Sequence, residues 1–364
     1  MALFRHTQRA TVRQGLELLL AMGDPSLLDV FAEGCTIADS PSLGPQLAEQ
    51  VHPQHQHWLA LQLLHATRRC ADIDNLEMYG CDDFEDLSLL TRFSMMKAVV
   101  LGDCRALRDL SALRQMKTLR HLMLTDCHVL TDISPLAEAP WLDEIALLGC
   151  LELADISALR SLICLEGLCL AQMPKLQDLE PISVMQQLTS LEISDCAQLT
   201  SISPIASLRS LDALNLTDCH AVTDLHPLRG LSALRGLNLR GFQGTDIQAV
   251  GELASLRGLT LSQSAVSDLS PLNQLDSLTG ADLSNNDNMK RLALSDLPQL
   301  HRLHLHDCGA LEQLELVRLP ALSTLDLEGC DALRSIRLTS CHALPDLSML
   351  DDLPSLEDVQ IDVP

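Results

Sequence analysis

The apolar residues of this chain follow one short phrase, Leu-x-x-Leu-x-Leu-x-x-Cys, which returns at a nearly fixed spacing. Nine of the thirteen cysteines close this phrase, and they are Cys81, Cys104, Cys127, Cys150, Cys196, Cys219, Cys308, Cys330 and Cys341. The first four are 23 residues apart. A fixed period of this size is typical of one supersecondary unit stacked on itself, because a single copy cannot bury its apolar face alone. The sequence therefore predicts a solenoid.

One copy of the unit shows which structure the pattern predicts. Leu122 and Leu124 alternate with polar or outward residues, which indicates a strand with period two. The next apolar residues, Leu130, Ile133 and Leu136, recur every three positions and favour a tight 3₁₀-like return rather than a long helix. In the segment Thr131-Asp132-Ile133-Ser134-Pro135-Leu136, we expect the serine to cap the return and the proline to take its first helical position.

These strand and return phrases resemble the leucine-rich repeat superfamily over residues 71–361. The Asp-Ile-Ser-Pro-Leu return is similar to the 22-residue class of internalins and of phosphatase-regulating leucine-rich repeat proteins. The cysteine is similar to that of the cysteine-containing class in some F-box proteins. The resemblance implies an α/β solenoid that is right-handed, with a parallel sheet on its concave face. Protein binding is implied only as a habit of the family, because a fold does not determine a function.

The two ends of the chain depart from the pattern. Residues 1–70 lack the phrase, and we predict an N-terminal helical cap there, followed by a solenoid of 12 to 13 coils over residues 71–364. From Leu278 the phrase appears every 11 residues, which predicts second, convex strands in the C-terminal third. Leu356, Val359 and Ile361 predict a last strand, and the register after Cys330 stays open.

The charge and the cysteines narrow the functional classes. The net charge is −24, and the repeats hold 43 of the 49 acidic residues against 20 of the 25 basic ones. This balance argues against nucleic acid and favours a basic or polar protein partner, although the acids could simply keep a leucine-rich surface soluble. We find no 18-residue apolar run and no evident Sec signal, and export by a non-Sec route stays open. Cysteines in a ladder position favour thiols, and hence a cytoplasm, of the producer or of a host cell. We expect a monomer.

The outward residues of the strands form the candidate binding surface, which the small side chains predict to be a shallow trough. Just before the ladder cysteines stand Asp103, Asp126, Asp195, Asp218 and Asp307, which either cap turns or contact a ligand. The candidate binding residues are Tyr79, His121, Met123, Glu144, Glu192, Asp195, Asn215, Asp218, Asn238, Arg240, Asp282, Arg302, His304, His306, Asp326 and Glu328.

Two histidine groups raise alternatives. His304 and His306 lie near Asp282, Asp326 and Glu328 by the 22-residue period, which allows either a zinc site or an exposed ionic cluster. A second group, His52, His55 and His57, allows a metal patch or a polar loop.

We find no catalytic motif and predict no catalytic residue, resident metal or cofactor. The sequence thus favours a non-enzymatic binding scaffold: an adaptor, an inhibitor or immunity-type protein, or a secreted effector. The alternatives are an enzyme or enzyme subunit with its chemistry in residues 1–70, and a metal-dependent module around His304 and His306.

Overall fold

The chain divides into two units, Met1–Leu162 and Ile163–Pro364, and each of them contains a stack of coils. The computed structural model describes residues 74–78, 85–93, 95–345 and 347–362. The helical cap that we predict for residues 1–70 lies outside the described residues, as do His52, His55, His57 and Tyr79. No helix among the described residues is both long and apolar enough to span a membrane.

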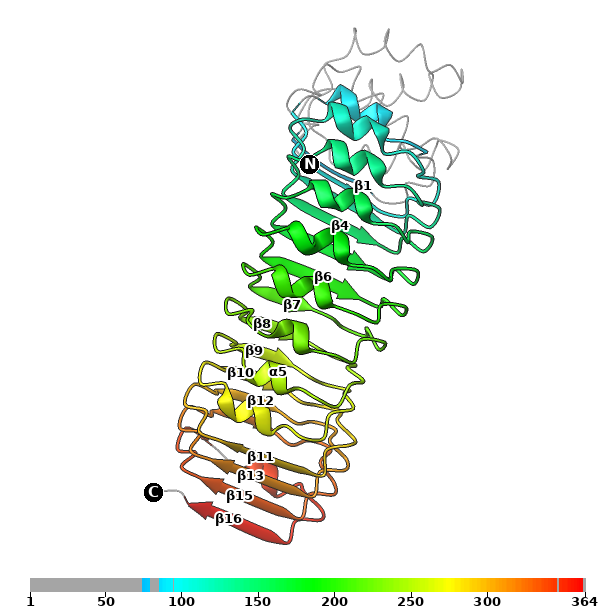
Figure 1. Ribbon diagram of the computed structural model, residues 1–364. Helices are drawn as coiled ribbons and strands as arrows, with labels where there is room; N and C mark the ends of the chain where they lie inside the picture. The colour runs from blue at the N-terminus through cyan, green and yellow to red at the C-terminus, as the bar shows by residue number, and fades with distance from the viewer. Residues whose placement is uncertain (1–73, 79–84, 94, 346, 363–364) are drawn as a thin grey trace, which may run out of the picture. The chain divides into compact units, whose positions relative to one another are not determined.

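In the first unit, short parallel strands alternate with 3₁₀ turns (Figure 1). In chain order its elements are β1 (Asn75–Met78), η3 (Ser88–Arg92), β2 (Ala98–Leu101), η4 (Ser111–Gln115), β3 (His121–Thr125), η5 (Ser134–Glu138), β4 (Glu144–Leu148) and η6 (Ser157–Ser161). The strands pair in register, as His121 does with Ala98 on one side and with Glu144 on the other. The predicted strand-and-3₁₀ coil is therefore confirmed.

The second unit contains the larger sheet, which we call the main sheet. Its strands are β5 (Gly167–Ala171), β6 (Ser190–Ser194), β7 (Ala213–Asn215), β8 (Gly236–Asn238), β9 (Gly258–Thr260), β10 (Gly280–Asp282), β12 (Arg302–His304) and β14 (Thr324–Asp326). All neighbours are parallel. The returns contain η7 (Glu180–Val184), η8 (Ser203–Ser207), η9 (His226–Leu228), the α-helical turn α5 (Gln248–Gly251), η10 (Ser270–Gln274) and η11 (Ser348–Leu350).

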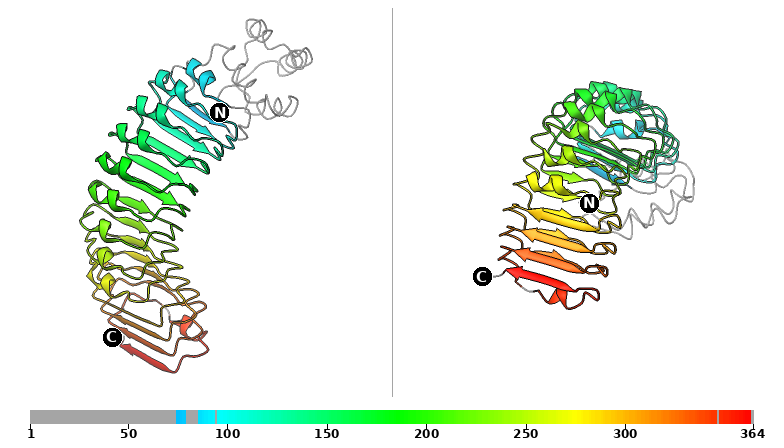
Figure 2. Two further views of the ribbon diagram at one scale, coloured as in Figure 1. Left: turned by 45° about the vertical axis from the view of Figure 1, so that its right-hand side comes forward. Right: turned by 60° about the horizontal axis from the view of Figure 1, so that its bottom comes forward.

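The last coils return through strands instead of 3₁₀ turns. These strands are β11 (Arg291–Ser295), β13 (Gln313–Val317), β15 (Ser335–Thr339) and β16 (Asp358–Asp362), and together they form a parallel return sheet. They lie on the side that the helical turns take in the preceding coils of this unit (Figures 1 and 2). The 11-residue spacing predicted this second sheet, and β16 confirms the predicted last strand.

The core is the row of leucines between the two sides of each coil. In β6, Leu191 is 1% exposed while the outward Glu192 is half-buried, so the alternation that the sequence predicts has the right register. Leu214 and Leu237 continue the row on the next strands. Because the register is correct, every outward residue of the main sheet can be placed.

Several ladder cysteines donate to the coil before them, whereas Cys127 and Cys150 donate to carbonyls of their own coil. The Sγ thiol of Cys219 donates to the carbonyl of Ile193 at 3.3 Å, and that of Cys330 to the carbonyl of Leu305 at 3.1 Å. Every cysteine among the described residues is a free thiol. One coil uses a stronger donor at the same position, because Nδ2 of Asn286 donates to the carbonyls of Leu261 and Leu283 at 2.9 and 2.7 Å.

The prediction of a serine cap on each return is wrong. Ser134 is already inside η5, and its backbone N–H donates to Oδ1 of Asp132 at 2.7 Å. The same bond recurs at Asp155 and at Asp268. The aspartate prevails because its carboxylate, two residues earlier, reaches the first free N–H of the turn. The proline at the start of η5 is as predicted.

Candidate functional site

An open hollow with a volume of about 480 Å³ lies on the outward face of the main sheet, from β6 to β12. Its lining is Ser190, Leu191, Glu192, Ala213, Leu214, Asn215, Gly236, Leu237, Asn238, Arg257, Gly258, Leu259, Thr260, Thr279, Gly280, Ala281, Asp282, Arg302 and His304. The hollow therefore brings together six of the predicted binding residues: Glu192, Asn215, Asn238, Asp282, Arg302 and His304.

The floor of the hollow is made of small residues at the first position of successive strands. Gly236, Gly258 and Gly280 are paired in register across β8, β9 and β10. A Cβ atom built on Gly258 would meet nothing within 4 Å, and one on Gly236 would meet only the Cβ of Ala213 at 4.0 Å. The same position holds Arg302 and Thr324 on later strands, so the backbone here accepts large side chains. The hollow is open because the sequence places glycine there, not because the fold requires it.

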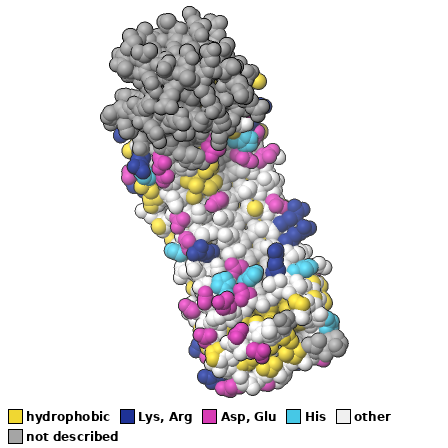
Figure 3. All heavy atoms as spheres, turned by 180° about the vertical axis from the view of Figure 1, so that it is seen from behind, with side chains coloured by type: hydrophobic (Ala, Val, Ile, Leu, Met, Phe, Trp, Pro, Cys, Tyr) yellow, Lys and Arg dark blue, Asp and Glu magenta, His cyan; other side chains and the backbone are white. Residues whose placement is uncertain are grey.

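Charged groups are divided across the width of the hollow. Arg257 immediately precedes β9 and Arg302 begins β12, so both stand at the amino ends of strands. Asp282 and His304 end their strands. The Arg302 guanidinium nitrogens lie 3.8 to 3.9 Å from the position that a Cβ on Gly280 would take. Figure 3 shows basic, acidic and histidine side chains around uncharged surface on one face of the molecule.

Several outward polar residues also serve the backbone. The Oδ1 atoms of Asn215 and Asn238 accept the backbone N–H groups of Thr217 and Arg240, each at 3.0 Å. Asp282 does the same for Ser284 at 3.1 Å, and Asp326 for Glu328 at 3.2 Å. Such Asx turns end the strand after three residues. These side chains therefore have a structural task, and the face they present to a ligand is held rigid by it.

The aspartates before the ladder cysteines occupy a left-handed turn. Asp195, Asp218 and Asp307 have φ values of 53°, 55° and 56°, and glycine takes the equivalent place at Gly241 and Gly329. This conformation is open to aspartate, asparagine and glycine but is unfavourable for most side chains. The backbone therefore supplies a structural reason for aspartate at this position.

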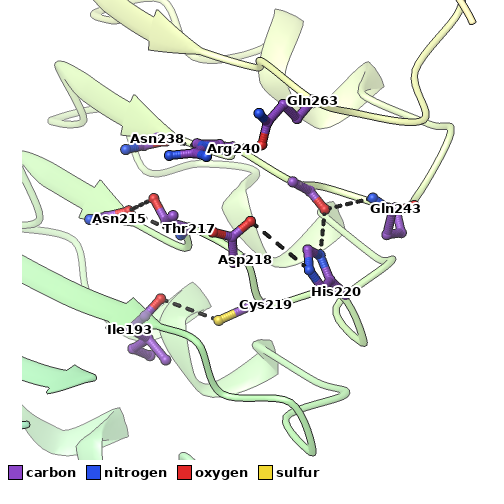
Figure 4. Close-up of polar contacts among 11 residues, drawn as sticks. Ile193, Asn215, Thr217, Asp218, Cys219, His220, Asn238, Arg240, Gln243 and Gln263 are labelled. Carbon is purple, nitrogen blue, oxygen red and sulfur yellow. Dashed lines mark hydrogen bonds and ion pairs between the residues drawn. The ribbon is translucent and has the colours of Figure 1, made fainter. Parts of the chain in front are cut away.

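Around Asp218 the turn also holds a small polar network (Figure 4). The His220 ring donates from Nδ1 to the carbonyl of Gly241 at 2.9 Å, and its Nε2 lies 4.0 Å from Oδ1 of Asp218. Gln243 donates to the same carbonyl at 2.8 Å. Arg240 points along the edge and donates from Nε to Oε1 of Gln263 at 3.1 Å. Arg240 and Asp218 thus belong to the edge of the sheet, outside the hollow's lining.

The two predicted histidines meet on one acid. Nδ1 of His304 lies 3.8 Å and Nδ1 of His306 lies 3.7 Å from Oδ2 of Asp326, while His306 also shares a 2.8 Å hydrogen bond with Oγ of Ser284. Among the described residues no group of three histidine, cysteine or acidic side chains is placed to hold a metal ion. The structure gives the metal-module alternative no support there and places these residues in a half-buried polar cluster around one carboxylate.

The outward cysteine nearest the hollow is poorly suited to nucleophilic chemistry. Cys169 on β5 is paired in register with Glu192 on β6. Burial, together with the charge of Glu192, raises the pKa of Cys169 to about 12. The thiol therefore stays protonated at neutral pH, and the thiolate that nucleophilic catalysis needs is not formed. The arrangement can bind and orient groups by hydrogen bonds and charge.

The remaining predicted residues lie apart from the hollow's lining. In the first unit, His121 and Glu144 form a 2.9 Å pair on neighbouring strands, and Met123 is half-buried on the same face. Sequence reasoning missed Arg257, because this position stands one residue before the glycine of the strand phrase. The signal was present: Arg235 and Arg257 take the same position on successive coils, and Arg235 pairs with Asp212 at 2.7 Å.

Two family models match separate parts of the chain, each less than half of it. The model described as "Plant disease resistance protein RPS2-like, leucine-rich repeats" matches residues 72–220. The model described as "Endo-beta-N-acetylglucosaminidase EndoS LRR domain" matches residues 248–362. Both models describe the repeat that the coils show. The chain is a leucine-rich repeat protein. No curated protein matches this leucine-rich repeat protein.

Solved structures agree with the fold of the leucine-rich repeat protein. An internalin, InlF of Listeria monocytogenes, is 22% identical with a TM-score of 0.57, covering 89% of this chain and 96% of the internalin chain. A chain in the TLR13–ssRNA13 complex is 17% identical with a TM-score of 0.52, covering 78% of this chain and 51% of the other. InlJ of Listeria monocytogenes, whose functional domain is described as including a cysteine ladder, is 18% identical with a TM-score of 0.49, covering 79% and 72%. At these identities the likeness to InlF and to the chain of the TLR13 complex concerns the fold alone, and nothing is concluded from InlJ.

Proposed function

We propose that this leucine-rich repeat protein is a non-enzymatic scaffold that binds another protein in the hollow of the main sheet. The observation that carries the proposal is the glycine floor. Gly236 and Gly258 leave open space at positions where the repeat accepts larger side chains. A partner's backbone or side chain can therefore approach the main sheet closely over about 480 Å³.

The charge supports a partner with basic or polar groups along the acidic edge. Asp195, Asp218 and Asp307 lie at equivalent turns at the carboxyl ends of the strands, and they are exposed or half-buried. Exposed charges of one sign mainly speed the encounter with an oppositely charged protein. An adaptor, an inhibitor or immunity-type protein, or a delivered effector would each use such a surface. The ladder thiols are hydrogen-bonded donors, and this supports a reducing cytoplasm, of the producer or of a host, as the proposed location. The proposed oligomeric state is a monomer.

Filling the hollow tests the proposal. Gly258→Trp places a large side chain where the backbone has ordinary β geometry and a Cβ meets no atom. We expect the variant to fold with an unchanged melting temperature. The amount of each specific partner cross-linked to it should be at least about tenfold lower than with the wild type, because the tryptophan excludes the partner sterically. The measurement is quantitative mass spectrometry of proteins cross-linked to the wild type and to each variant in cell extract.

Gly309→Trp is the matched control. Gly309 is also exposed, and a Cβ there also meets nothing within 4 Å, but it lies in the turn after Cys308 and not in the hollow. Partners lost with Gly258→Trp and retained with Gly309→Trp would support the hollow as the binding site. Equal recovery of every protein by both variants and by the wild type would show that the hollow is not used.

A further inference from the structure

Two arginines of the hollow carry charges that no described residue neutralises. Elsewhere in the second unit most arginines are engaged: Arg235 with Asp212 at 2.7 Å, and both Arg291 and Arg337 with Glu315 at 3.4 and 3.1 Å. Among the described residues no acid forms an ion pair with Arg257 or with Arg302. In a chain with 49 acidic residues and 25 basic ones, such pairs would be easy to form.

The acids of the hollow are committed to other groups. Oδ1 of Asp282 accepts the backbone N–H of Ser284 at 3.1 Å, and Oε1 of Glu192 accepts from Oγ of Ser194 at 3.5 Å. Both acids also stand at the third position of their strands, whereas Arg302 stands at the first position of β12. The guanidinium groups of Arg257 and Arg302 are therefore charged groups of the hollow that have no ion-pair partner among the described residues. Both stand at the side of the hollow formed by the amino ends of the strands.

The register places the two guanidinium groups around the glycine floor. Gly258, Gly280 and Arg302 are direct neighbours on β9, β10 and β12, and Arg257 immediately precedes Gly258. The strands are about 4.8 Å apart, so the Arg257 and Arg302 backbones are separated by about 10 Å, with Gly280 between them. Arginine side chains bridge such a gap around one bidentate anion, and a guanidinium fork matches the two oxygens of a carboxylate.

We propose that the hollow binds an extended, acidic peptide segment whose Asp or Glu carboxylate lies between Arg257 and Arg302, above Gly258 and Gly280. This inference rests on the proposed scaffold function and adds the chemistry of the partner. A single carboxylate suits the hollow better than a polyanion, because Glu192 and Asp282 line the same space and repel closely spaced phosphates. The open position at Gly258 admits the peptide backbone, and basic residues that flank the carboxylate can face the acidic edge.

The test uses a displayed library of random dodecapeptides as the probe. Selections are run on the whole protein, on R257Q/R302Q, on Gly258→Trp and on a control, R108Q/R334Q. Arg108 and Arg334 are exposed, they form no ion pair with a described residue, and neither lines the hollow. Circular dichroism and the melting temperature check that every variant is folded. We expect Asp and Glu to be enriched several-fold by the wild type and by the control, and not by R257Q/R302Q.

A selected peptide then gives the quantitative result. On the wild type, replacing its key Glu by Gln should weaken binding about tenfold, as expected for the loss of one charge-assisted pair. On R257Q/R302Q the two peptides should bind equally. Peptides that are blocked by Gly258→Trp but show no acidic enrichment would overturn this inference and leave the scaffold in place.

Two further outcomes separate the proposals. The absence of any peptide sensitive to Gly258→Trp would overturn the scaffold function itself. A single-stranded oligonucleotide that binds in an Arg257- and Arg302-dependent manner, and displaces the peptide, would show that the occupant is a nucleic acid and not an acidic peptide.

Discussion

At the scale of single residues, the ladder position shows two ways of filling one buried site. Met173 and Phe242 fill it with apolar side chains, whereas in other coils a polar side chain there donates a hydrogen bond to a carbonyl of the coil before it. Cys219 does this through a thiol, a weak donor, whereas Asn286 does it twice through an amide. Asn286 also accepts, at Oδ1, the backbone N–H and the hydroxyl of Ser264 at 2.7 and 2.9 Å. It therefore ties two neighbouring coils together while 1% exposed.

Asn286→Ala should accordingly lower the free energy of unfolding by about 3 kcal/mol. The change leaves the carbonyl of Leu261 and the N–H and hydroxyl of Ser264 without their partners in a buried site, and each unpaired group costs about 1 kcal/mol or more. Urea unfolding followed by circular dichroism measures the loss. Asn286→Cys should recover part of the stability, because cysteine serves this position in other coils. A loss below about 0.5 kcal/mol for Asn286→Ala would contradict this account.

The sequence predicted the ladder position only in the coils that hold a cysteine there. Nine cysteines indicated the position, and Asn286 lies one 22-residue period before Cys308, so its place in the ladder could have been found from the spacing. Asn286 was missed because a single asparagine in a polar stretch has no apolar pattern around it. The buried network with Ser264 depends on a residue of another coil, which no local pattern reveals.

At the scale of the elements, most helical returns are held at their start by an aspartate, whereas in the return through η8 the hydroxyl of Ser201 takes that place. Backbone and side-chain hydrogen bonds from Ser270 lower the pKa of Asp268 from its ordinary value, as Ser157 does for Asp155 and His226 for Asp224. The folded protein thus favours the charged carboxylate. Such a group contributes stability above its unfolded pKa, near 3.8, and the contribution is lost as the pH falls through its lower, folded-state pKa.

Asp268→Ala should lower the free energy of unfolding at pH 7 by about 0.5 kcal/mol, at the low end for a lost cap because the group is largely exposed. The difference from the wild type should shrink as the pH falls below about 4, where the wild-type carboxylate also becomes protonated. Chemical unfolding at several pH values measures it. A difference that stayed constant down to pH 2 would mean that the carboxylate charge has no part in the cap.

The element pattern was predictable and its capping was not. Apolar residues at every third position indicated the 3₁₀ return, and the 11-residue spacing after Leu278 indicated the return sheet. The Ser-Pro dipeptide suggested a serine cap, because serine and aspartate are both good caps and stand two residues apart. The choice depends on where the first turn begins, and boundaries are the least reliable part of a sequence-based prediction.

At the scale of the whole molecule, the net negative charge is large, and the basic residues are too few to pair with every acidic residue. A net charge of −24 on 364 residues implies self-repulsion in the folded state. Several acids are held at fixed turn positions on successive coils by their left-handed backbone, as Asp195 and Asp218 are. The scattered ion pairs are exposed and are each worth little.

The melting temperature should therefore rise, by a few degrees, when sodium chloride is increased from about 0.02 M to about 0.5 M, because the screening length falls to about 4 Å. Differential scanning calorimetry at constant pH measures the change. Potassium chloride should give the same result, which separates screening from effects of a particular cation. A melting temperature that falls with salt would show that ion pairs outweigh the repulsion.

Composition predicted this acidity, but not how charge is arranged in the hollow. The repeat allowed the outward residues of successive strands to be aligned, and this alignment placed Glu192, Asp282 and His304 beside their correct neighbours. The place of Arg257 in the lining could not be predicted in the same way, because it precedes the strand and reaches the hollow through a long, flexible side chain. Such an alignment predicts the directions of the Cβ atoms but not the position of the guanidinium group at the end of an arginine side chain.

The left-handed turn has a further consequence for how this protein can change. Along the main sheet the residues found there are unbranched at Cβ: aspartate, asparagine, glutamine and glycine. Single mutations to valine, isoleucine or threonine would strain the backbone, so the carboxyl edge can vary only within a small alphabet. The first strand position has no such restriction, since it already holds Gly258, Arg302 and Thr324. New binding specificities can thus arise in the hollow by point mutation, while the carboxyl edge keeps the same few residue types as the sequence diverges.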